Sequence, residues 1–256
     1  AVALGATAEQ ANAVSIPIAE ALTKDTLHFF TMTEARALAE YAKTKGFDAK
    51  AIEAKEIHKV AKKSFNPAVD GIDIALFGRM VAQAAELNVE AAASFAHAIS
   101  THKVTNEVEF FTALDDRQDE PGSAHMGSLE FNSATYYRYV RLDMGQLWQT
   151  LDGQNVPEAM EAFAKALYSA VPSARQTTQS GSSPWEFAKI LVRRGQALQV
   201  PFETAVRAEN GGFLQPSIAS LKEYLSKKEK LSGSLFGKIA ELDRKSTRLN
   251  SSHRIR

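Results

Sequence analysis

The chain has 256 residues, of which 45% are hydrophobic and 23% are charged, values that are ordinary for a globular protein with a substantial core. It lacks cysteine, which excludes disulfides and thiolate metal sites, and no apolar run approaches the roughly 20 residues that a membrane-spanning helix needs. No secretory signal precedes Ala1, so we expect a cytoplasmic protein of one or two domains without a membrane partner.

The last residues, 243–256, show neither an apolar period nor helix caps. They read like the translation of a sequencing adapter, so we expect a disordered, artefactual tail and a gene product that ends elsewhere. The alternative is a genuine disordered basic tail. Without this segment the chain has 25 basic and 29 acidic residues, a net charge of −4. Composition alone therefore gives no support for nucleic-acid binding.

The first third of the chain is predicted to be helical. Residues 33–46 begin with Thr33 as a plausible N-cap and end on Gly46, and residues 49–63 continue with apolar residues at helical spacing. A boundary is expected near 64–71, where turn-forming residues cluster.

Strands and helices alternate after that boundary. Residues 69–81 alternate well enough for a strand, with Ile72, Ile74 and Leu76 on one side. Residues 88–101 are rich in small residues and are predicted to be a helix. The remaining segments are strands at 102–116, 129–144 and 185–194 and helices at 156–171, 201–209 and 216–231. This order predicts an α+β fold with an antiparallel sheet.

Histidines and carboxylates lie close together in the middle of the sequence. His97 and His125, with Asp115 or Glu130, could bind a divalent metal or transfer protons, so a metal-dependent ribonuclease is the alternative function. His97 and His102 are five residues apart and match no known zinc spacing, and solvated turn residues explain the cluster more simply. No nucleotide-binding or nucleophile motif is present.

Aromatic residues are dense in the same region, close to two arginines. Rings on a sheet can stack on bases and arginines can hold phosphates, although the tyrosines fit a sheet core better. The residues are Phe110, Phe111, Phe131, Tyr136, Tyr137, Tyr139, Arg138 and Arg141.

Several long, collinear segments resemble the CasC family, the repeated backbone subunits of the type I-E CRISPR Cascade complex. They are GIDIALFGRM, FAHAISTHKV, EFFTALDD, GSAHMGSLEFNSATYYRYVRLDMGQL and GGFLQPSI. The resemblance covers about 69–147 and 172–218, whereas residues 1–65 are compatible but contribute little.

This resemblance implies a hand-like subunit. Residues 1–66 would form a helical finger region, truncated at its start. Residues 67–242 would form an RRM-like, ferredoxin-type antiparallel palm, with a β-hairpin thumb at about 103–130. The family's first strand, with its basic guide-gripping segment, has no counterpart in this sequence.

The resemblance also implies a non-catalytic function without cofactor or metal. The partners would be the CRISPR guide RNA, the target DNA strand, other Cascade subunits and copies of the same chain in a helical filament along the guide. Each thumb would insert between guide and target and displace a nucleotide. By match to the family, the wedge would contain Met80, Phe110, Phe111, Thr112, Leu114 and Met126.

Two arginines are candidates for contacts with the guide backbone. Arg79 follows the glycine of FGRM, where a backbone can approach closely. Arg175 lies in a polar, glycine-containing loop that suits phosphate contacts, although plain surface charge explains it equally well.

Overall fold

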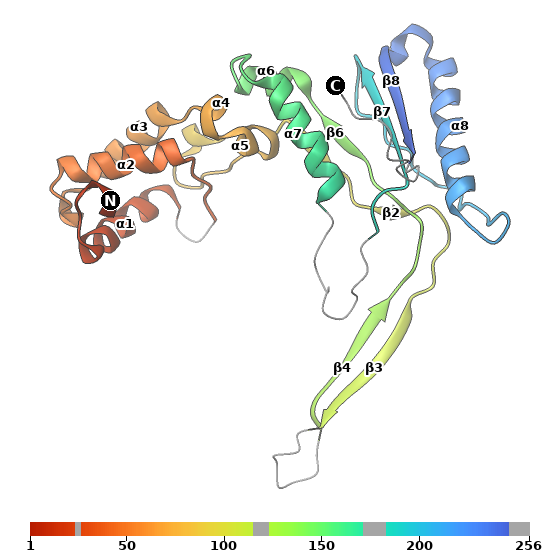
Figure 1. Cartoon of the computed structure of the whole chain (residues 1–256), viewed down its shortest axis with the longest axis horizontal. Coiled ribbons are helices and arrows are strands. Elements are labelled where there is room, and N and C mark those ends of the chain that lie inside the picture. Colours follow the sequence, from red (N-terminus) through yellow and green to blue (C-terminus); the bar gives the residue numbers. More distant parts are fainter. Residues whose placement is uncertain (24–26, 115–122, 171–182, 246–256) are drawn as a thin grey trace, which may run out of the picture. The chain divides into compact units, whose positions relative to one another are not determined.

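The computed structural model describes residues 1–23, 27–114, 123–170 and 183–245, and the side chains of 112–114, 123–126 and 245 are not described. The chain divides into two compact units, each built from two segments (Figure 1). Unit 1 contains Ala1–Ser94 and Val140–Ser182, and unit 2 contains Phe95–Tyr139 and Ser183–Arg256. The predicted domain boundary at residue 66 thus falls inside unit 1.

Unit 1 is mainly helical, which confirms the helical prediction for the first third of the chain. Its α-helices are α1 (Ala8–Leu22), α2 (Met32–Thr44), α3 (Ala54–Ser64), α4 (Pro67–Asp70), α5 (Ile72–Phe77), α6 (Met144–Thr150) and α7 (Val156–Ser169). Its 3₁₀ turns are η1 (Val2–Leu4), η2 (Ala49–Ala51) and η3 (Ala85–Leu87). The short strands β1 (Ala93–Phe95) and β6 (Val140–Leu142) pair with each other.

The start of α2 differs from the prediction by two residues. Thr31, not Thr33, is the N-cap: its hydroxyl accepts from the Glu34 N–H at 3.1 Å, and the Glu34 carboxylate accepts from the Thr31 N–H at 3.0 Å. This reciprocal capping box satisfies two N–H groups that would otherwise lack partners. The Thr33 N–H instead donates to Asp70 at 2.7 Å and ties α2 to α4.

Two apolar clusters form the core of unit 1. One joins α1, α2, α3 and the segment around η3 and consists of Ala21, Leu22, Leu38, Ile57, Ala61, Val81, Ala84 and Leu87. The other joins α5, β1, α6 and α7 and consists of Ala68, Ala75, Leu76, Ala92, Ala93, Leu147, Leu151, Val156, Ala159 and Phe163.

The strand prediction for 69–81 and the helix prediction for 88–101 were both wrong. Residues 67–77 form α4 and α5, because Asn66 caps the Ala68 N–H and Pro67 occupies a first-turn position. Residues 88–101 are largely extended, with β1 and β2 (Ile99–Ser100). Ala92 donates to the Ala75 carbonyl at 3.2 Å and accepts from the Asp143 N–H at 2.8 Å. These nonlocal bonds outweigh the helix preference of alanine.

The described residues of unit 2 form three antiparallel ladders and one long helix. Its elements are β2, β3 (Glu107–Leu114), β4 (Ser123–Phe131), β5 (Tyr136–Tyr137), β7 (Phe187–Arg193), α8 (Leu214–Ser232), η4 (Gly233–Phe236) and β8 (Lys238–Lys245). The pairs are β2–β5, β3–β4 and β7–β8. The α+β class is confirmed. The described strands form two-stranded ladders, so a single RRM-type sheet stays a prediction.

The predicted helix at 201–209 is also absent from the structure. The Val200 N–H donates to the Tyr137 hydroxyl at 3.2 Å, and the Val206 N–H donates to the Thr101 carbonyl at 2.9 Å. The Val206 N–H therefore bonds to another part of unit 2 where a helix would have paired it within the segment.

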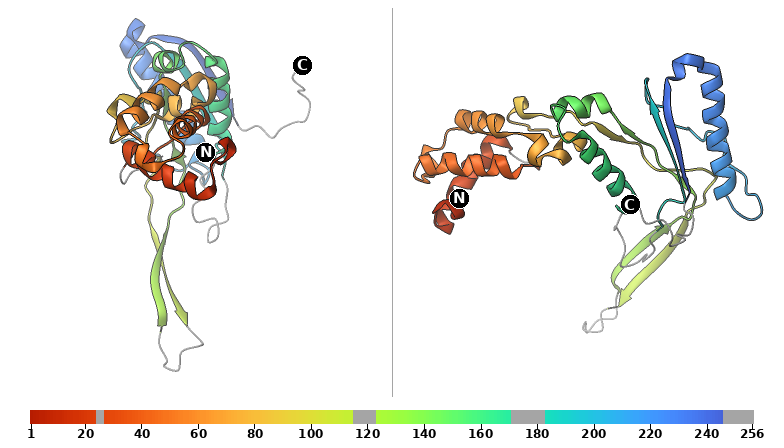
Figure 2. Two further views of the ribbon diagram at one scale, coloured as in Figure 1. Left: turned by 90° about the vertical axis from the view of Figure 1, so that its left-hand side faces the viewer. Right: turned by 45° about the horizontal axis from the view of Figure 1, so that its top comes forward.

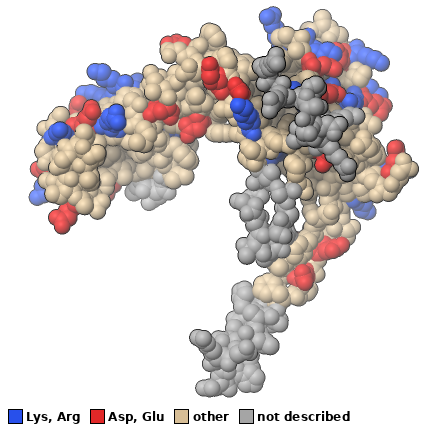
Figure 3. Space-filling model, viewed as in Figure 1, with Lys and Arg blue, Asp and Glu red and all other residues tan. Residues whose placement is uncertain are grey.

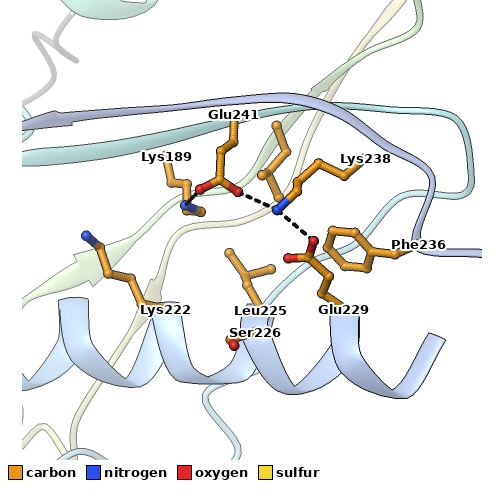
Figure 4. A pocket seen from close by; sticks show the side chains of 9 residues that line it. Lys189, Lys222, Leu225, Ser226, Glu229, Phe236, Lys238 and Glu241 are labelled. Atoms are coloured by element: carbon orange, nitrogen blue, oxygen red, sulfur yellow. Dashed lines mark hydrogen bonds and ion pairs between the residues drawn. The ribbon is translucent and has the colours of Figure 1, made fainter. Parts of the chain in front are cut away.

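A pocket at the α8 face of the β7–β8 ladder is lined by paired charges (Figure 4). Lys189 donates to Glu241 and Asp243, and Lys238 donates to Glu229 and Glu241. These pairs hold α8 to the ladder, and both lysines form ion pairs with carboxylates of the same unit.

Residue Asp243, where the predicted disordered tail begins, lies inside β8. It pairs with Lys189 in the β7–β8 register and accepts from Lys222 at 2.6 Å. Hydrogen bonds from Lys222 and Lys189 lower the pKa of Asp243. The prediction of disorder was therefore wrong for 243–245, and 246–256 lie outside the described residues.

Among the described residues, no helix has the length and apolar character needed to cross a membrane.

Candidate functional site

The hairpin of β3 and β4 is the predicted thumb. Its register runs from Glu107 opposite Phe131 to Ala113 opposite His125, and a bulge then shifts Leu114 opposite Ser123. Within unit 2 the hairpin extends away from β7, β8 and α8 (Figures 1 and 2). Among the described strands, β3 and β4 pair only with each other. The ladder is therefore held by its own cross-strand contacts.

Phe110 and Phe111 are neighbours on β3 and point to opposite faces of the hairpin. The Phe110 side chain is 83% exposed, and Phe111 is 37% exposed. Phe111 lies opposite Gly127, over which its ring extends, whereas Phe110 lies opposite Ser128. The two rings therefore have different surroundings, and Phe110 is the most solvent-exposed aromatic side chain among the described residues.

The strands of the hairpin carry acidic residues but no lysine or arginine. Glu107, Glu109 and Glu130 are exposed, and the sequences of β3 and β4 contain neither lysine nor arginine. Figure 3 shows the acidic side chains on this part of the molecule. Carboxylates repel phosphates, so these strands cannot hold a nucleic-acid backbone by ion pairs. The exposed apolar residues of β3, Val108, Phe110 and Phe111, are better suited to contact with bases.

Three other predicted wedge residues lie on the same ladder. Thr112 pairs with Met126, and Leu114 follows at the bulge. Their side chains lie outside the described residues, so the structure places only their backbones. The sixth residue, Met80, belongs to unit 1, where its side chain is 70% exposed.

Arg79, the predicted phosphate contact next to Met80, is an interior residue. The side chains of Arg79 and Glu34 are each 1% exposed, and Nη1 of Arg79 lies 2.8 Å from the Glu34 carboxylate. Nε donates to the Leu87 carbonyl at 3.1 Å, and the guanidinium stacks 4.3 Å from the Phe65 ring centre. Because the guanidinium has internal partners and almost no exposed surface, Arg79 is not available for contact with RNA.

His28 lies close to this buried pair, and its lowered pKa predicts that acid destabilises the fold. Burial, followed by the charge of Arg79, lowers the pKa of His28 below its ordinary value of 6.5. The unfolded chain then binds more protons than the folded chain just below pH 6.5, so folding stability should fall as the pH drops through that value. Urea denaturation at pH 7.5, 6.5 and 5.5 measures this slope. His28→Gln should reduce it, and an unchanged slope in that variant would assign the acid sensitivity to other groups.

Two of the tyrosines are confirmed as structural residues. The Tyr137 and Tyr139 hydroxyls accept from the backbone N–H groups of Val200 and Leu198 at 3.2 and 3.1 Å. Burial raises the pKa of Tyr137. The more exposed Tyr136 donates to the side chain of Asn132.

The remaining candidates are not brought together. Arg175 and Asp115 lie outside the described residues, as does the side chain of His125. His97 is exposed, while His102 is buried, stacks on Phe213 at 3.7 Å and accepts from the Thr135 N–H. No group of three or more histidine or carboxylate side chains in the described part of the chain is arranged to hold a metal ion.

Sequence reasoning missed Gly127. A glycine inside a strand weakens that strand and often marks a close approach by another group. That signal was available in AHMGSLEF, but its meaning depends on the register that places Gly127 opposite Phe111.

Comparison with known proteins gives a consistent result. The model of the CT1975-like protein family matches residues 1–252. A solved chain described as "CRISPR RNA-guided surveillance complex, pre-nicking" matches with a TM-score of 0.71 and 25% identity, over 96% of this chain and 73% of that chain. Another, described as "CRISPR RNA-guided surveillance complex", matches with a TM-score of 0.59 and 25% identity, over 90% of this chain and 82% of that chain. No curated protein matches.

The predicted CasC-type resemblance is thereby confirmed at the level of the family, and the chain belongs to the CT1975-like protein family.

Proposed function

We propose that this protein is a non-catalytic subunit of an RNA-guided CRISPR surveillance complex of the Cascade type. It binds the guide RNA along its backbone, polymerises along it as a helical filament, and supports recognition of the target DNA strand. Its family and its similarity to two chains described as parts of such complexes support the role as a complex subunit.

The β3–β4 hairpin is the observation that carries the finer proposal. It is a long ladder without lysine or arginine, and it presents Phe110 and Phe111 on opposite faces. An apolar side chain that enters a base stack recovers part of the unstacking cost, which is about a few kcal/mol per step. We propose that the hairpin separates guide and target at one nucleotide per subunit, with Phe110, Phe111, Thr112, Leu114, Met126 and Met80 in the wedge.

The two units then have different tasks. Unit 2, with α8 on the β7–β8 ladder, would contribute the RRM-like palm and the thumb, and the helices of unit 1 would contribute the finger region. Guide phosphates would be contacted by basic residues away from the hairpin, with Arg175 as the remaining candidate. The other partners are Cascade subunits and further copies of the chain.

Co-purification of RNA is the experiment that tests this proposal. The full chain is expressed together with a CRISPR repeat–spacer transcript and the other subunits of its complex, purified, and analysed by its 260/280 nm absorbance ratio. Nuclease-protected RNA of the transcript's sequence is expected. Absence of protected RNA from the purified complex would contradict guide binding.

The same sample tests whether the protein is an enzyme. Because we propose no catalytic role, RNA should stay intact with Mg²⁺ or Mn²⁺, and EDTA should change nothing. Metal-stimulated cleavage that is lost in His125→Ala would instead support the ribonuclease alternative.

A further inference from the structure

The backbone conformation of Gly127 does not require a glycine. It lies in the interior of β4, where a residue without a side chain weakens the strand. Its φ angle is not in the left-handed region that favours glycine, since it is absent from the positive-φ glycines of the described chain. The backbone conformation therefore does not explain the glycine at this position, whereas its surroundings do.

The ring of Phe111 fills the space that a side chain at 127 would need. A β-carbon on Gly127 would lie 2.7 Å from Cζ and 2.8 Å from Cε1 of Phe111, closer than non-bonded carbon atoms come. The two residues are direct partners in the β3–β4 register. The ring therefore crosses from β3 to β4 and rests on the bare backbone there, an aromatic–glycine pairing that also supports the ladder.

This packing restricts the ring without burying it. Phe111 keeps 37% of its surface exposed, so part of the ring remains available to a ligand while its far edge is fixed. A side chain held in one orientation before binding loses less rotational freedom when it binds. The geometry therefore provides a fixed apolar surface on one face of the hairpin.

We infer that Gly127 is a positioning residue, which holds Phe111 in the orientation that contacts a nucleobase. The inference rests on the proposed function, because it concerns the wedge that the hairpin forms between guide and target. Gly127 acts only through the Phe111 ring and touches no nucleotide itself.

The test compares base displacement in complexes assembled with variants of the full chain. The guide carries 2-aminopurine at successive positions, and its fluorescence rises where a base is unstacked. Gly127→Ala should weaken binding of the target strand about threefold to tenfold and lower the 2-aminopurine fluorescence at the unstacked positions.

Gly212→Ala is the matched control, because a β-carbon there meets no atom within 4 Å. Gly127→Ala in a Phe111→Ala background should cause no further loss, because Gly127 acts only through the Phe111 ring.

The outcomes separate this inference from the proposed function. If Phe111→Ala leaves the fluorescence at the unstacked positions unchanged, Phe111 is not in the wedge and that part of the proposed function fails. If Phe111→Ala lowers it and Gly127→Ala does not, the positioning role of Gly127 is overturned. Hydrogen exchange of the β3–β4 amides provides the last check. Loss of their protection in Gly127→Ala would make Gly127 a folding requirement, which also overturns the inference.

Discussion

Replacing Arg79 with alanine should reduce the free energy of unfolding by about 3–5 kcal/mol, because it leaves the Glu34 carboxylate charged, buried and without its partner. Both side chains are 1% exposed, and Nη1 of Arg79 lies within 2.9 Å of both Glu34 oxygens. The variant also loses the Nε bond to Leu87 and the contact with the Phe65 ring. Urea denaturation followed by circular dichroism would show the loss as a lower midpoint.

Two further variants sharpen this experiment. The double change Arg79→Met with Glu34→Gln should recover much of the loss, because it removes both charges and leaves an amide oxygen at position 34 that can still accept from the Thr31 N–H. Lys165→Ala is the control, since the pair that it breaks with Glu161 lies on the surface and should leave the midpoint nearly unchanged. An Arg79→Ala protein with normal stability but weaker guide binding would restore Arg79 as a phosphate contact.

The pairing of Arg79 with Glu34 could not be predicted from the sequence. Arg79 follows a glycine in FGRM, and this local context fits a phosphate contact equally well. Its partner Glu34 lies 45 residues earlier, and no periodicity connects the two positions. Only the packing of α2 against the segment after α5 reveals that the charge is used internally.

Elements with strong local signals were predicted correctly. The helices α3, α7 and α8 have apolar residues at helical spacing, and β3 lies inside the strand predicted at 102–116. The strand predicted at 129–144 was wrong in its bounds: it overlaps β4 only at 129–131, and the rest contains the short strands β5 and β6. The thumb expected at about 103–130 corresponds to strands that run from Glu107 to Phe131. Here local preference and tertiary structure agree.

Elements fixed by nonlocal contacts were predicted wrongly. Residues 88–101 have the composition of a helix, yet Ala92 bonds to residues of α5 and to Asp143. Residues 201–209 also have a helical pattern, but the Val206 N–H donates to the Thr101 carbonyl of another segment of unit 2. The candidate site follows the same rule: the sequence identified Phe110 and Phe111, whereas the role of Gly127 required the register.

Phe111→Ala combined with Met80→Ala should weaken binding of the target strand far more than binding of the guide. Contact between a base and an aromatic side chain contributes about 1–3 kcal/mol, so the loss for each displaced base is about fivefold to 150-fold. Guide binding should persist, because phosphate contacts supply most of it and neither substitution removes a charge. Affinity for a labelled target strand, compared with the amount of protected guide RNA, measures both effects in one preparation.

A double-mutant cycle with these two residues asks whether they act on the same nucleotide. Met80 lies in unit 1 and Phe111 in unit 2, so separate contacts would give additive losses and a shared nucleotide would give a coupling energy. Leu231→Ala is the control, since it removes an exposed apolar residue at the end of α8, outside the proposed wedge. Equal loss of guide and target binding in the double variant would contradict the wedge. A selective loss with strong coupling would support contact of both residues with the same displaced base.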